Sequence, residues 1–579
     1  MLTNRKPQHM IDFEINELSK KFNYDPKAIL EILQSLFKTR NGLTVETIHE
    51  VARSLHIPVE HAYGVATFYS LLATKPGKDG IIRVCDGPVC WLCKGVDVKE
   101  IVEQNLGDKW EVTRSSCLGL CDRAPAALVN DEQCGPINPK VVASIATGWR
   151  GETVDYSQAR PGELRVMLSQ TGIIDPDSIQ SALTLGAYQG FRKALELSPE
   201  EVISIIEAAG LTGRGGAGFP VGRKWRFVFQ ADRSPKYVIC NADESEPLIF
   251  KDRVLIDTNP HQILEGMAIA GYACGAKEAF IYIRGEYTNQ SERLVHAIKE
   301  ANERGWLGNN IQDSNFSFNI HVHCGAGAYI CGEETALIES LEGKRGEPRV
   351  RPPYPPTYGY LSFPTLVNNV ESYSSVPAIL QNGADWYRSL SNYPTPGTKL
   401  YMLLGHINNP GLFEAPFGLT LAQLINQYGG GMREGSAFQF ALTGGAAGTF
   451  VPPTLMNVPI DYTSVAKGVA LGAGAFLICD KSVSPVALLA NLLFFFMDES
   501  CGKCTPCRVG TYRAYSILER MKKGHGWFGD IDELKSLSDV MFNSSFCGLG
   551  QSVPTPINSA LLHFPDKFVE IKRGSAYAD

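Results

Sequence analysis

The first part of the chain carries apolar residues at the spacing of a helix face. Helix starts are marked by Asp25 before Pro26, by Thr44 and by Pro58, because capping oxygens and proline suit the first turn, whose backbone N–H groups lack partners. Residues 8–72 are therefore predicted to be helical, within an N-terminal helical segment spanning 1–77. The best-patterned helix face consists of Ile29, Leu30, Ile32, Leu33 and Leu36.

The pattern changes near residue 80. Gly80–Cys85 reads GIIRVC, a β-branched run that is typical of a strand. Residues 78–148 around it are predicted to form a small α/β unit. The next stretch, 149–175, lacks a clear period and contains Pro and Gly, which predicts a linker.

A larger α/β domain is predicted for 176–396, and Pro394-Thr-Pro-Gly marks its end. Residues 397–480 are strand-rich, and 481–579 have a helical pattern. The chain is thus expected to be a multidomain α/β and α protein. Its later predicted elements are strands at 400–404, 438–442 and 475–479, a helix near 419–428, and helices at 486–497, 511–523, 531–541 and 556–564.

Composition and charge narrow the class of protein. A chain of 579 residues is too long to form a single hydrophobic core, and at about 150 residues per domain its length suggests about four domains. A hydrophobic content of 44% is ordinary for a globular chain, and a net charge of -7 gives no electrostatic reason to expect nucleic acid. The start lacks the apolar region of a signal peptide, and the most apolar stretch, 486–497, is too short to span a bilayer. We expect a soluble, cytoplasmic protein without a transmembrane segment.

Fifteen cysteines in such a chain indicate metal or redox sites rather than disulfides. Cys501, Cys504 and Cys507 have C-x2-C-x2-C spacing, and Cys547 follows after about two predicted helices. Three close thiolates and one distant thiolate suit a [4Fe–4S] cluster. A four-cysteine zinc site is the alternative, although zinc sites usually use two separated pairs.

A second group combines Cys85-x4-Cys90 with Cys117-x3-Cys121. Two pairs on two loops suit the two irons of a [2Fe–2S] centre, and zinc again remains an alternative. Cys93 is a spare that could compete with Cys90. The other cysteines are scattered and are interpreted as small buried residues: Cys134, Cys240, Cys274, Cys324, Cys331 and Cys479.

A glycine-rich segment, GLTGRGGAGFPVGRKW at 210–225, indicates a backbone that approaches a ligand closely. A Rossmann fingerprint would need a strand before it, but a capped helix starting at Ser198 precedes it. Arg214 and Lys224 supply positive charge for phosphate or reduced flavin. Phe219 and Phe227 offer stacking faces. A plain structural loop is the alternative.

Acidic and amide residues follow at three further places. After a predicted strand at 236–240, the motif NADESEP crowds together acceptors that suit ribose or ribityl hydroxyls, unless it is a solvated turn. Next, two glutamates open a helix after Gly332, where helix capping is a real alternative. The third place, the segment PPYPPTYGYLSFPTLVNNVES, provides the aromatic ring of Tyr354 and the amides of Asn368 and Asn369. The candidate residues are Asn241, Asp243, Glu244 and Glu246; Glu333 and Glu334; and Tyr354, Asn368 and Asn369.

Together these motifs resemble a known family. GRGGAGFPVGRKW, NADESEP, GAGAYICGEE, PTLVNNVES and ESCGKCTPCRVGT occur in the order found in the flavin subunit of respiratory NADH dehydrogenase and its relatives. The fused N-terminal domain is similar to the thioredoxin-like [2Fe–2S] subunit of that complex. The combination most resembles the diaphorase flavin subunit of soluble NAD-reducing [NiFe] hydrogenases. The resemblance covers about residues 8–575, and its motifs are specific as a set rather than singly.

The resemblance implies a fold and a cofactor set. It implies a thioredoxin-like [2Fe–2S] domain at 78–148, an FMN- and NADH-binding α/β domain that is not a classical Rossmann fold, a ubiquitin-like β-grasp and a helical [4Fe–4S] domain. NADH would stack its nicotinamide on the flavin, with its adenine among Phe219, Phe227 and Tyr354, while Glu246 and Glu334 bind its polar groups. FMN would lie against Gly213, Arg214, Gly215 and Lys224, with Asn241, Asp243, Glu244, Tyr329, Gly332, Asn368 and Asn369 around it.

The expected reaction follows from the cofactors. A flavin bridges two-electron hydride transfer and one-electron cluster chemistry, so no side chain needs to act as an acid or base. The chain lacks the paired C-x2-C motifs of a nickel site, so the expected partners are a second iron–sulfur diaphorase subunit and a [NiFe] hydrogenase heterodimer. Alternatives are a flavin subunit of NADH–quinone oxidoreductase or of NAD-dependent formate dehydrogenase, and a zinc-stabilised, non-catalytic scaffold. Two departures from the family are Cys93 and Leu248, which stands where the family has glycine.

Overall fold

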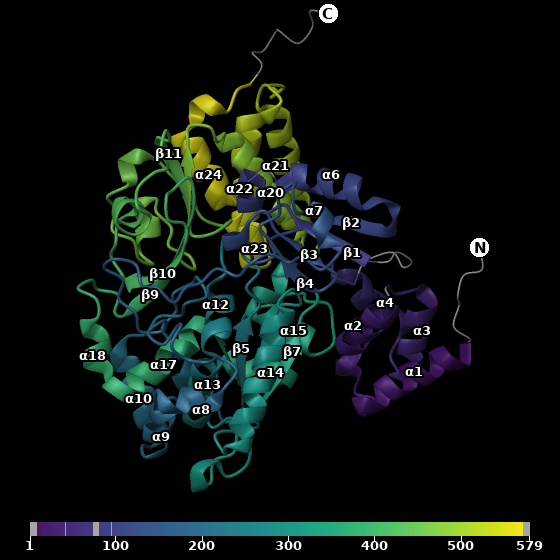
Figure 1. The fold of residues 1–579 in the computed structure, drawn as a ribbon, viewed down its shortest axis with the longest axis vertical. Coiled ribbons are helices and arrows are strands. Elements are labelled where there is room, and N and C mark those ends of the chain that lie inside the picture. The colour runs from purple at the N-terminus through teal and green to yellow at the C-terminus, as the bar shows by residue number, and fades with distance from the viewer. Residues whose placement is uncertain (1–7, 41, 73–79, 94, 571–579) are drawn as a thin grey trace, which may run out of the picture.

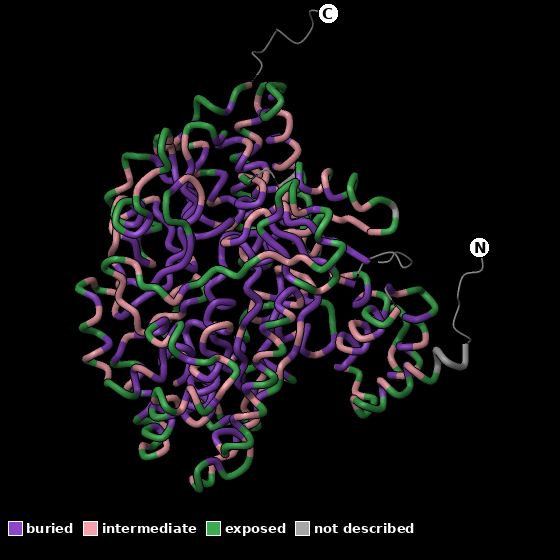
Figure 2. Tube along the Cα trace, viewed as in Figure 1, coloured by how far each residue is buried: buried purple, intermediate pink, exposed green. Residues whose placement is uncertain are grey.

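The computed structural model describes residues 8–40, 42–72, 80–93 and 95–570 (Figure 1). The ends of the expected N-terminal segment and C-terminal domain, and the junction at 73–79, lie outside the described residues. The N-terminal helices form a lobe at one side, and the C-terminal helices lie beside the small sheet that begins with β1. The tube in Figure 2 shows that buried backbone runs through all the main parts of the chain.

The N-terminal lobe contains the helices that the pattern predicted. Asp25 accepts a hydrogen bond from Lys27 N at 3.0 Å, and Thr44 Oγ1 accepts one from Thr47 N at 3.2 Å. The lobe is fixed to the large domain, since Gln34 Nε2 donates to Gly325 O at 2.7 Å. Its helices are α1 (Gln8–Lys21), α2 (Ile29–Arg40), α3 (Val45–Ser54) and α4 (Val59–Phe68).

The unit that follows is a four-stranded mixed sheet in the order β2-β1-β3-β4. The strand predicted at its start is confirmed, and all its residues are buried. The elements are β1 (Gly80–Cys85), α5 (Pro88–Leu92), α6 (Gly95–Leu106), β2 (Trp110–Ser115), β3 (Ala127–Val129), β4 (Glu132–Cys134) and α7 (Val142–Ile145).

Residues 149–175 contain no helix or strand, but they are not a free spacer. The Glu414 carboxylate accepts hydrogen bonds from the N–H groups of Val166, Met167 and Leu168 at 2.8–3.1 Å. The Arg160 guanidinium donates to three backbone carbonyls of the same neighbouring region. The segment is therefore fixed along the five-stranded sheet described below.

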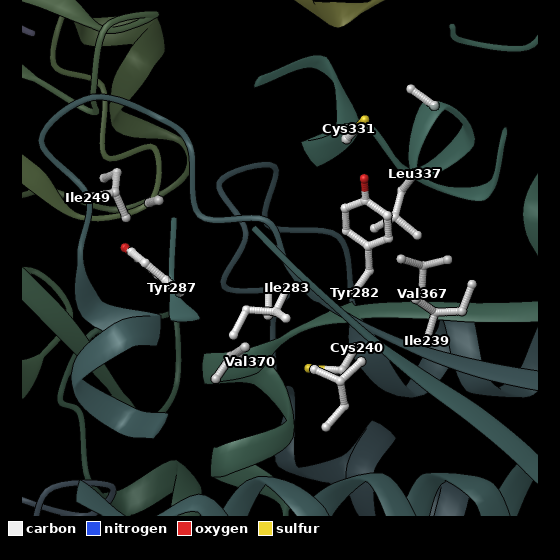
Figure 3. Packing of buried hydrophobic residues seen from close by; sticks show 14 of the residues in the cluster. Ile239, Cys240, Ile249, Tyr282, Ile283, Tyr287, Cys331, Leu337, Val367 and Val370 are labelled. Carbon is white, nitrogen blue, oxygen red and sulfur yellow. The ribbon is translucent and has the colours of Figure 1, made fainter. Parts of the chain in front are cut away.

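The large domain is built on a parallel sheet in the order β7-β6-β5-β8. Helices cover it, so its strands carry buried apolar residues such as Ile239, Tyr282 and Val367, which pack together in Figure 3. The strands are β5 (Tyr237–Ala242), β6 (Glu278–Ile283), β7 (Asn319–Cys324) and β8 (Thr365–Asn369). The helices are α8 (Ile179–Thr184), α9 (Gln189–Leu195), α10 (Pro199–Ala209), α11 (Val221–Gln230), α12 (Lys251–Thr258), α13 (Pro260–Cys274), α14 (Thr288–Glu303), α15 (Glu334–Leu341), α16 (Pro355–Tyr358), α17 (Val370–Asn382) and α18 (Ala384–Ser389).

A five-stranded sheet in the order β10-β9-β13-β11-β12 follows. The three predicted strands are confirmed, as is the helix near 419–428, which consists of α19 (Leu421–Gln423) and a π-helical turn, Leu424–Tyr428. The pattern did not predict β10 or β12. The strands are β9 (Thr398–Gly405), β10 (Gly411–Pro416), β11 (Phe438–Thr443), β12 (Thr449–Val451) and β13 (Ala475–Asp480).

The C-terminal region is helical, as predicted. One helix begins earlier than expected, at Thr505 rather than Thr511, because Pro506 suits its first turn. Among the described residues, none of the helices is long and apolar enough to cross a membrane. The helices are α20 (Pro485–Asp498), α21 (Thr505–Lys522), α22 (Asp530–Ser544), α23 (Gly548–Ser552) and α24 (Pro554–His563).

Candidate functional site

The candidate site lies at the carboxyl ends of the parallel strands, where α/β sheets commonly bind ligands. Asn241 at the end of β5 pairs with Asn369 at the end of β8 in the sheet register. Asn241 Nδ2 donates to Gly332 O at 2.8 Å. The sheet therefore brings together three of the predicted motifs that are far apart in the sequence.

The glycine-rich loop lies above this edge and follows a helix, as predicted. Its preceding helix, α10, has a capping box between Ser198 and Glu201. The loop closes on itself through Gly213 N, which donates to Phe219 O at 2.8 Å. Gly218 has a φ of +68°, and a Cβ there would lie 2.5 Å from the Tyr462 ring. Glycine is needed because the loop packs directly on the five-stranded region.

Two connected chambers open between these elements. The inner chamber has a volume of about 420 Å³ and the outer chamber about 1160 Å³. Both are lined by Gly215, Asn241, Gly332, Glu333, Asn369 and Gly548, so they form one cleft. Of the other predicted residues, the inner chamber has Asp243, Glu244, Glu246 and Tyr329, and the outer chamber has Gly213, Phe219, Lys224, Phe227, Glu334, Tyr354 and Asn368.

Arg214 is the predicted residue that does not line the cleft. Its fully buried guanidinium donates to Tyr387 Oη at 2.9 Å and to Thr398 O at 3.0 Å, and it stacks over the Phe417 ring. The expectation that its charge faces phosphate or reduced flavin is wrong, because the side chain points away from the cleft toward β9. Only the backbone of Arg214 lies next to the cleft, because it connects Gly213 and Gly215, which line it.

The outer chamber combines exposed aromatic rings with cations. Phe219, Phe227 and Tyr354 all line this chamber and are 42%, 41% and 54% exposed, so their rings are open to a ligand. Lys224 Nζ lies 3.4 Å from Glu334 Oε2. Arg351, which the motifs did not reveal, lies 3.4 Å from Glu333 Oε1. The chamber therefore offers stacking faces and positive charge for a nucleotide.

The inner chamber is lined by buried carboxyl groups. Asp243 Oδ2 has no hydrogen-bond partner, and burial raises the pKa of this carboxyl well above its ordinary value. Glu246 accepts hydrogen bonds from Tyr329 Oη at 2.5 Å and from Ala447 N at 3.1 Å. Glu246 therefore lies in the inner chamber, whereas Glu334 lies in the outer chamber with the aromatic rings.

Two other predicted glutamates are engaged by helix starts. Glu333 accepts hydrogen bonds from the N–H groups of Thr335 and Ala336, so the capping alternative applies to it. The Glu244 carboxylate accepts from Asp252 N and Arg253 N at the start of α12, and burial raises its pKa to about 7. Both residues still line the cleft, but part of their hydrogen-bonding capacity is used within the protein.

The four cysteines of the C-terminal group line one small cavity. Cys504 is the N-cap residue of α21, Cys507 lies in its first turn, and Cys547 is the N-cap residue of α23. Cys507 and Cys547 are each 6% exposed, and burial raises the pKa of Cys547 to about 11. Four converging thiols in a three-plus-one arrangement fit a [4Fe–4S] cluster.

The N-terminal group is also brought together. Cys117 Sγ and Cys121 Sγ are 3.5 Å apart, and the Cys85 thiol interacts with those of Cys90 and Cys117. All four are buried, whereas Cys93 is exposed, so the geometry favours Cys90 over Cys93 as the ligand. Within the described ranges, no group of three or more His, Cys, Asp and Glu side chains is arranged to hold a single metal ion.

Leu248 connects the cleft to the N-terminal cysteines. It is fully buried with a φ of +79°, a left-handed conformation that glycine adopts more readily, and its N–H faces the sulfur of Cys121. The substitution thus keeps a glycine-like backbone. Beside it, Arg253 forms a bidentate ion pair with Asp122 at 2.7 Å. The segment from Leu248 to Arg253, which includes the start of α12, therefore lies between the cleft and the [2Fe–2S] ligands.

Several cleft residues have no signal in the local sequence motifs. Lys251 and Asp252 come from α12, Ala447 and Gly472 from the five-stranded region, and Leu549 from the cluster region. The unpartnered Asp243 oxygen, the open space beside Gly215 and the aromatic wall fit a flavin and a nicotinamide nucleotide. With two thiol sets next to this cleft, the fold and site define an iron–sulfur flavoprotein component of an oxidoreductase.

Comparison with known families agrees with this class. The chain matches the Nuo51 FMN-binding domain at 206–378, the NADH-ubiquinone oxidoreductase-F iron–sulfur binding region at 487–571, a thioredoxin-like [2Fe–2S] ferredoxin at 15–150 and an SLBB domain at 400–448. The chain belongs to the family of flavin subunits that includes the F-type component of NADH-quinone oxidoreductase. The expected fold class and the set of FMN, [2Fe–2S] and [4Fe–4S] cofactors are confirmed.

Individual relatives point to two kinds of complex. The NADP-reducing hydrogenase subunit HndC of Solidesulfovibrio fructosivorans is 45% identical over 407 residues, 70% of this chain and 83% of the relative. An F-type component of NADH-quinone oxidoreductase from Rhizobium meliloti is 43% identical over 406 residues, 70% of this chain and 96% of the relative. A crystal structure of NAD+-reducing [NiFe]-hydrogenase in the H2-reduced state matches with a TM-score of 0.82 and 30% identity, covering 94% of this chain and 93% of that one.

Proposed function

We propose that the chain moves electrons reversibly between NAD(H) and a [NiFe] hydrogenase module, with FMN held in the inner chamber and the nucleotide in the outer chamber. FMN, when bound, exchanges a hydride with nicotinamide and single electrons with iron–sulfur clusters, which lets the two couples communicate. The partners in this proposal are a second iron–sulfur diaphorase subunit and a [NiFe] heterodimer. A cytoplasmic location is part of the proposal, because so many free thiols suit a reducing compartment.

A shared wall carries the proposal. Ile330 and Leu549 line both the inner chamber and the cavity of the four C-terminal thiols. Gly548, which follows the ligand Cys547, lines both chambers of the cleft. One layer of apolar side chains therefore separates the flavin site from the [4Fe–4S] ligands. Such a layer excludes water between the two redox groups and keeps them close.

The side chains of the cleft have binding and orienting roles. Asn241, Asp243 and Asn369 would bind the polar edge and hydroxyl groups of the flavin. Lys224 and Arg351 would bind nucleotide phosphates, and the rings of Phe219, Phe227 and Tyr354 would stack on adenine. We assign no side chain as an acid or base. All of these side chains belong to the proposed FMN- and NADH-binding domain at 176–396. The other parts of the chain that we propose are a helical segment at 1–77, domains at 78–148, 397–480 and 481–579, and a linker at 149–175.

A role as the flavin component of an NADH–quinone oxidoreductase is the second candidate. Its support is sequence identity, since the F-type component from Streptomyces coelicolor is 47% identical over 384 residues. The hydrogenase structure instead matches nearly the whole chain, including the fused N-terminal [2Fe–2S] region. Purification from the source cell with attached subunits distinguishes the two functions, because only the hydrogenase function predicts a nickel-containing subunit among them.

The flavin site is tested by Gly215→Leu. A Cβ at Gly215 would meet only the Asn369 Cβ, at 3.5 Å, so the leucine side chain fits the backbone but fills the cleft. We expect loss of FMN without loss of folding. Gly64→Leu is the matched control, because its Cβ would also have ordinary clearance, at 3.6 Å from Arg345 Cδ, outside the cleft.

The order of electron transfer is tested by Cys504→Ser. Reduction of ferricyanide by NADH needs only the flavin, so we expect this activity to persist while electron transfer to the partner module is lost. Loss of both activities together in protein that still contains FMN would contradict the proposed order. Purified, folded wild-type protein that bound neither FMN nor nicotinamide nucleotide would refute the proposed function as a whole.

A further inference from the structure

A buried group of charges lies beneath the inner chamber. Lys251 lines this chamber and is 1% exposed. Its Nζ lies 2.6 Å from Asp252 Oδ1 and 2.9 Å from Asn369 Oδ1. The Asn369 Nδ2 donates in turn to Asp252 Oδ2 at 2.6 Å. Lys251 and Asp252 therefore fix the orientation of the Asn369 amide, which lines both chambers.

A second layer of charge lies behind Lys251. Glu371 Oε2 is 3.3 Å from Lys251 Nζ and 2.6 Å from Lys399 Nζ, which reaches in from β9. The Arg214 guanidinium is 4.0 Å from the other Glu371 oxygen. Three cations thus surround two carboxylates, Glu371 and Asp252, and all five side chains are at most 3% exposed.

Lys251 is the cationic side chain among the described residues that line the inner chamber. Burial disfavours its charged form, but Asp252, Glu371 and Glu244 outweigh burial, and the pKa of Lys251 is raised above its ordinary value. Burial lowers the pKa of Lys399 to about 7, so part of the charge on the far side is lost near neutrality. Lys251 therefore stays protonated and supplies positive charge to the inner chamber.

We propose that Lys251 is the positive charge that tunes the bound flavin, favouring its reduced form over its oxidised form in the inner chamber, with Asp252 moderating the effect. The inference rests on the proposed binding of FMN there. A flavin ring gains negative charge on reduction, and a cation attracts an added negative charge more strongly inside a buried site than across water. Lys251 thus has the role that was expected of Arg214.

The test compares dissociation constants for oxidised and reduced FMN under anaerobic conditions. For Lys251→Gln we expect the ratio of the reduced to the oxidised constant to rise at least tenfold. This change equals a fall of about 30 mV in the potential of a two-electron couple. Asp252→Asn should lower the ratio, because Lys251 loses a compensating charge, and Lys251→Arg should keep the ratio near that of wild type.

A lysine outside the cleft provides the control. Lys236 Nζ donates to Phe229 O at 2.6 Å and lines neither chamber, so Lys236→Gln should leave the ratio unchanged. A direct titration of the flavin potential in each variant gives a second readout that is independent of turnover.

Three outcomes would overturn the inference. The first is a ratio for Lys251→Gln within threefold of the wild-type ratio. This includes the case in which both flavin states bind more weakly by the same factor, as expected if Lys251 only held the phosphate. The second is a change of the ratio in the same direction in Lys251→Gln and Asp252→Asn, which would indicate a packing role. If Lys251→Gln does not fold, the third outcome decides: a ratio in Asp252→Asn that equals the wild-type ratio. Wild-type protein that bound no FMN would instead refute the proposed function.

Discussion

Replacing Asp122 by alanine tests how the thioredoxin-like domain is held against the flavin domain. Asp122 forms a bidentate pair with Arg253, with both oxygens 2.7 Å from one guanidinium nitrogen, and the two side chains are 2% and 4% exposed. Asp122 also accepts a hydrogen bond from Tyr156 Oη at 2.9 Å. The substitution leaves the Arg253 guanidinium buried without its main partner.

The structure sets the size of the effect. Breaking a buried ion pair by removing one partner costs about 3–5 kcal/mol, because the remaining charge is uncompensated. Asp257 Oδ2 lies 3.5 Å from Arg253 and retains part of the compensation. We therefore expect a cost near the lower limit, about 3 kcal/mol, which corresponds to roughly a hundredfold increase in opening of the domain contact.

Hydrogen–deuterium exchange of residues 117–123 measures this opening, with iron content checked so that cluster loss is not mistaken for it. Asp177→Ala is the matched control. Both oxygens of Asp177 also accept hydrogen bonds from one arginine, Arg293, through two of its nitrogens at 2.8 and 3.2 Å, but Asp177 is 56% exposed. Exposed pairs contribute about 0–1 kcal/mol, so this variant should exchange almost as wild type does.

The double variant Arg253→Met with Asp122→Leu isolates the cause. Removing both charges should restore most of the stability, because replacing a buried pair by apolar residues is often neutral. Equal effects of Asp122→Ala and Asp177→Ala, or no recovery in the double variant, would refute the reasoning that burial of an unpaired charge determines the cost.

Two further predictions concern the cysteines and pH. Cys90→Ser should abolish the [2Fe–2S] electron paramagnetic resonance signal and Cys93→Ser should leave it intact, because only Cys90 is buried with the other three thiols; the reverse result would exchange the two assignments. Burial lowers the pKa of His261 from 6.5 to about 4, so between pH 7 and pH 5 this histidine takes up a proton in the unfolded state but not in the folded state. The free energy of unfolding should therefore fall by about 2 kcal/mol as the pH is lowered over this range. Exchange protection of α13 should fall over this range in wild type and fall less in His261→Gln; equal losses would contradict the assignment.

Local sequence patterns predicted the elements that depend on local spacing. The run of β-branched residues at β1, the capping box of α10 and both cysteine sets needed no long-range information. The direction of a side chain in a loop did need it. Arg214 lies between two cleft-lining glycines, but its guanidinium is satisfied by Tyr387 and Thr398, which are remote in the sequence.

Residues whose role depends on contacts distant in the sequence could not be predicted from their own surroundings. Lys251 begins an ordinary helix, and its role depends on Asn369 and Glu371. Leu248 shows a different limit. Its left-handed backbone carries a cost of roughly 1–2 kcal/mol for a residue with a side chain, and complete burial of that side chain offsets it by about 1.5–3 kcal/mol. A motif alone does not reveal that balance.

The position of Gly548 and Leu549 has a consequence for how the two cofactor sites are coupled. These residues follow Cys547 directly, and they form part of the wall against which the flavin is proposed to rest. A displacement of the Cys547 backbone would therefore also move the wall of the inner chamber, because no intervening segment separates the two.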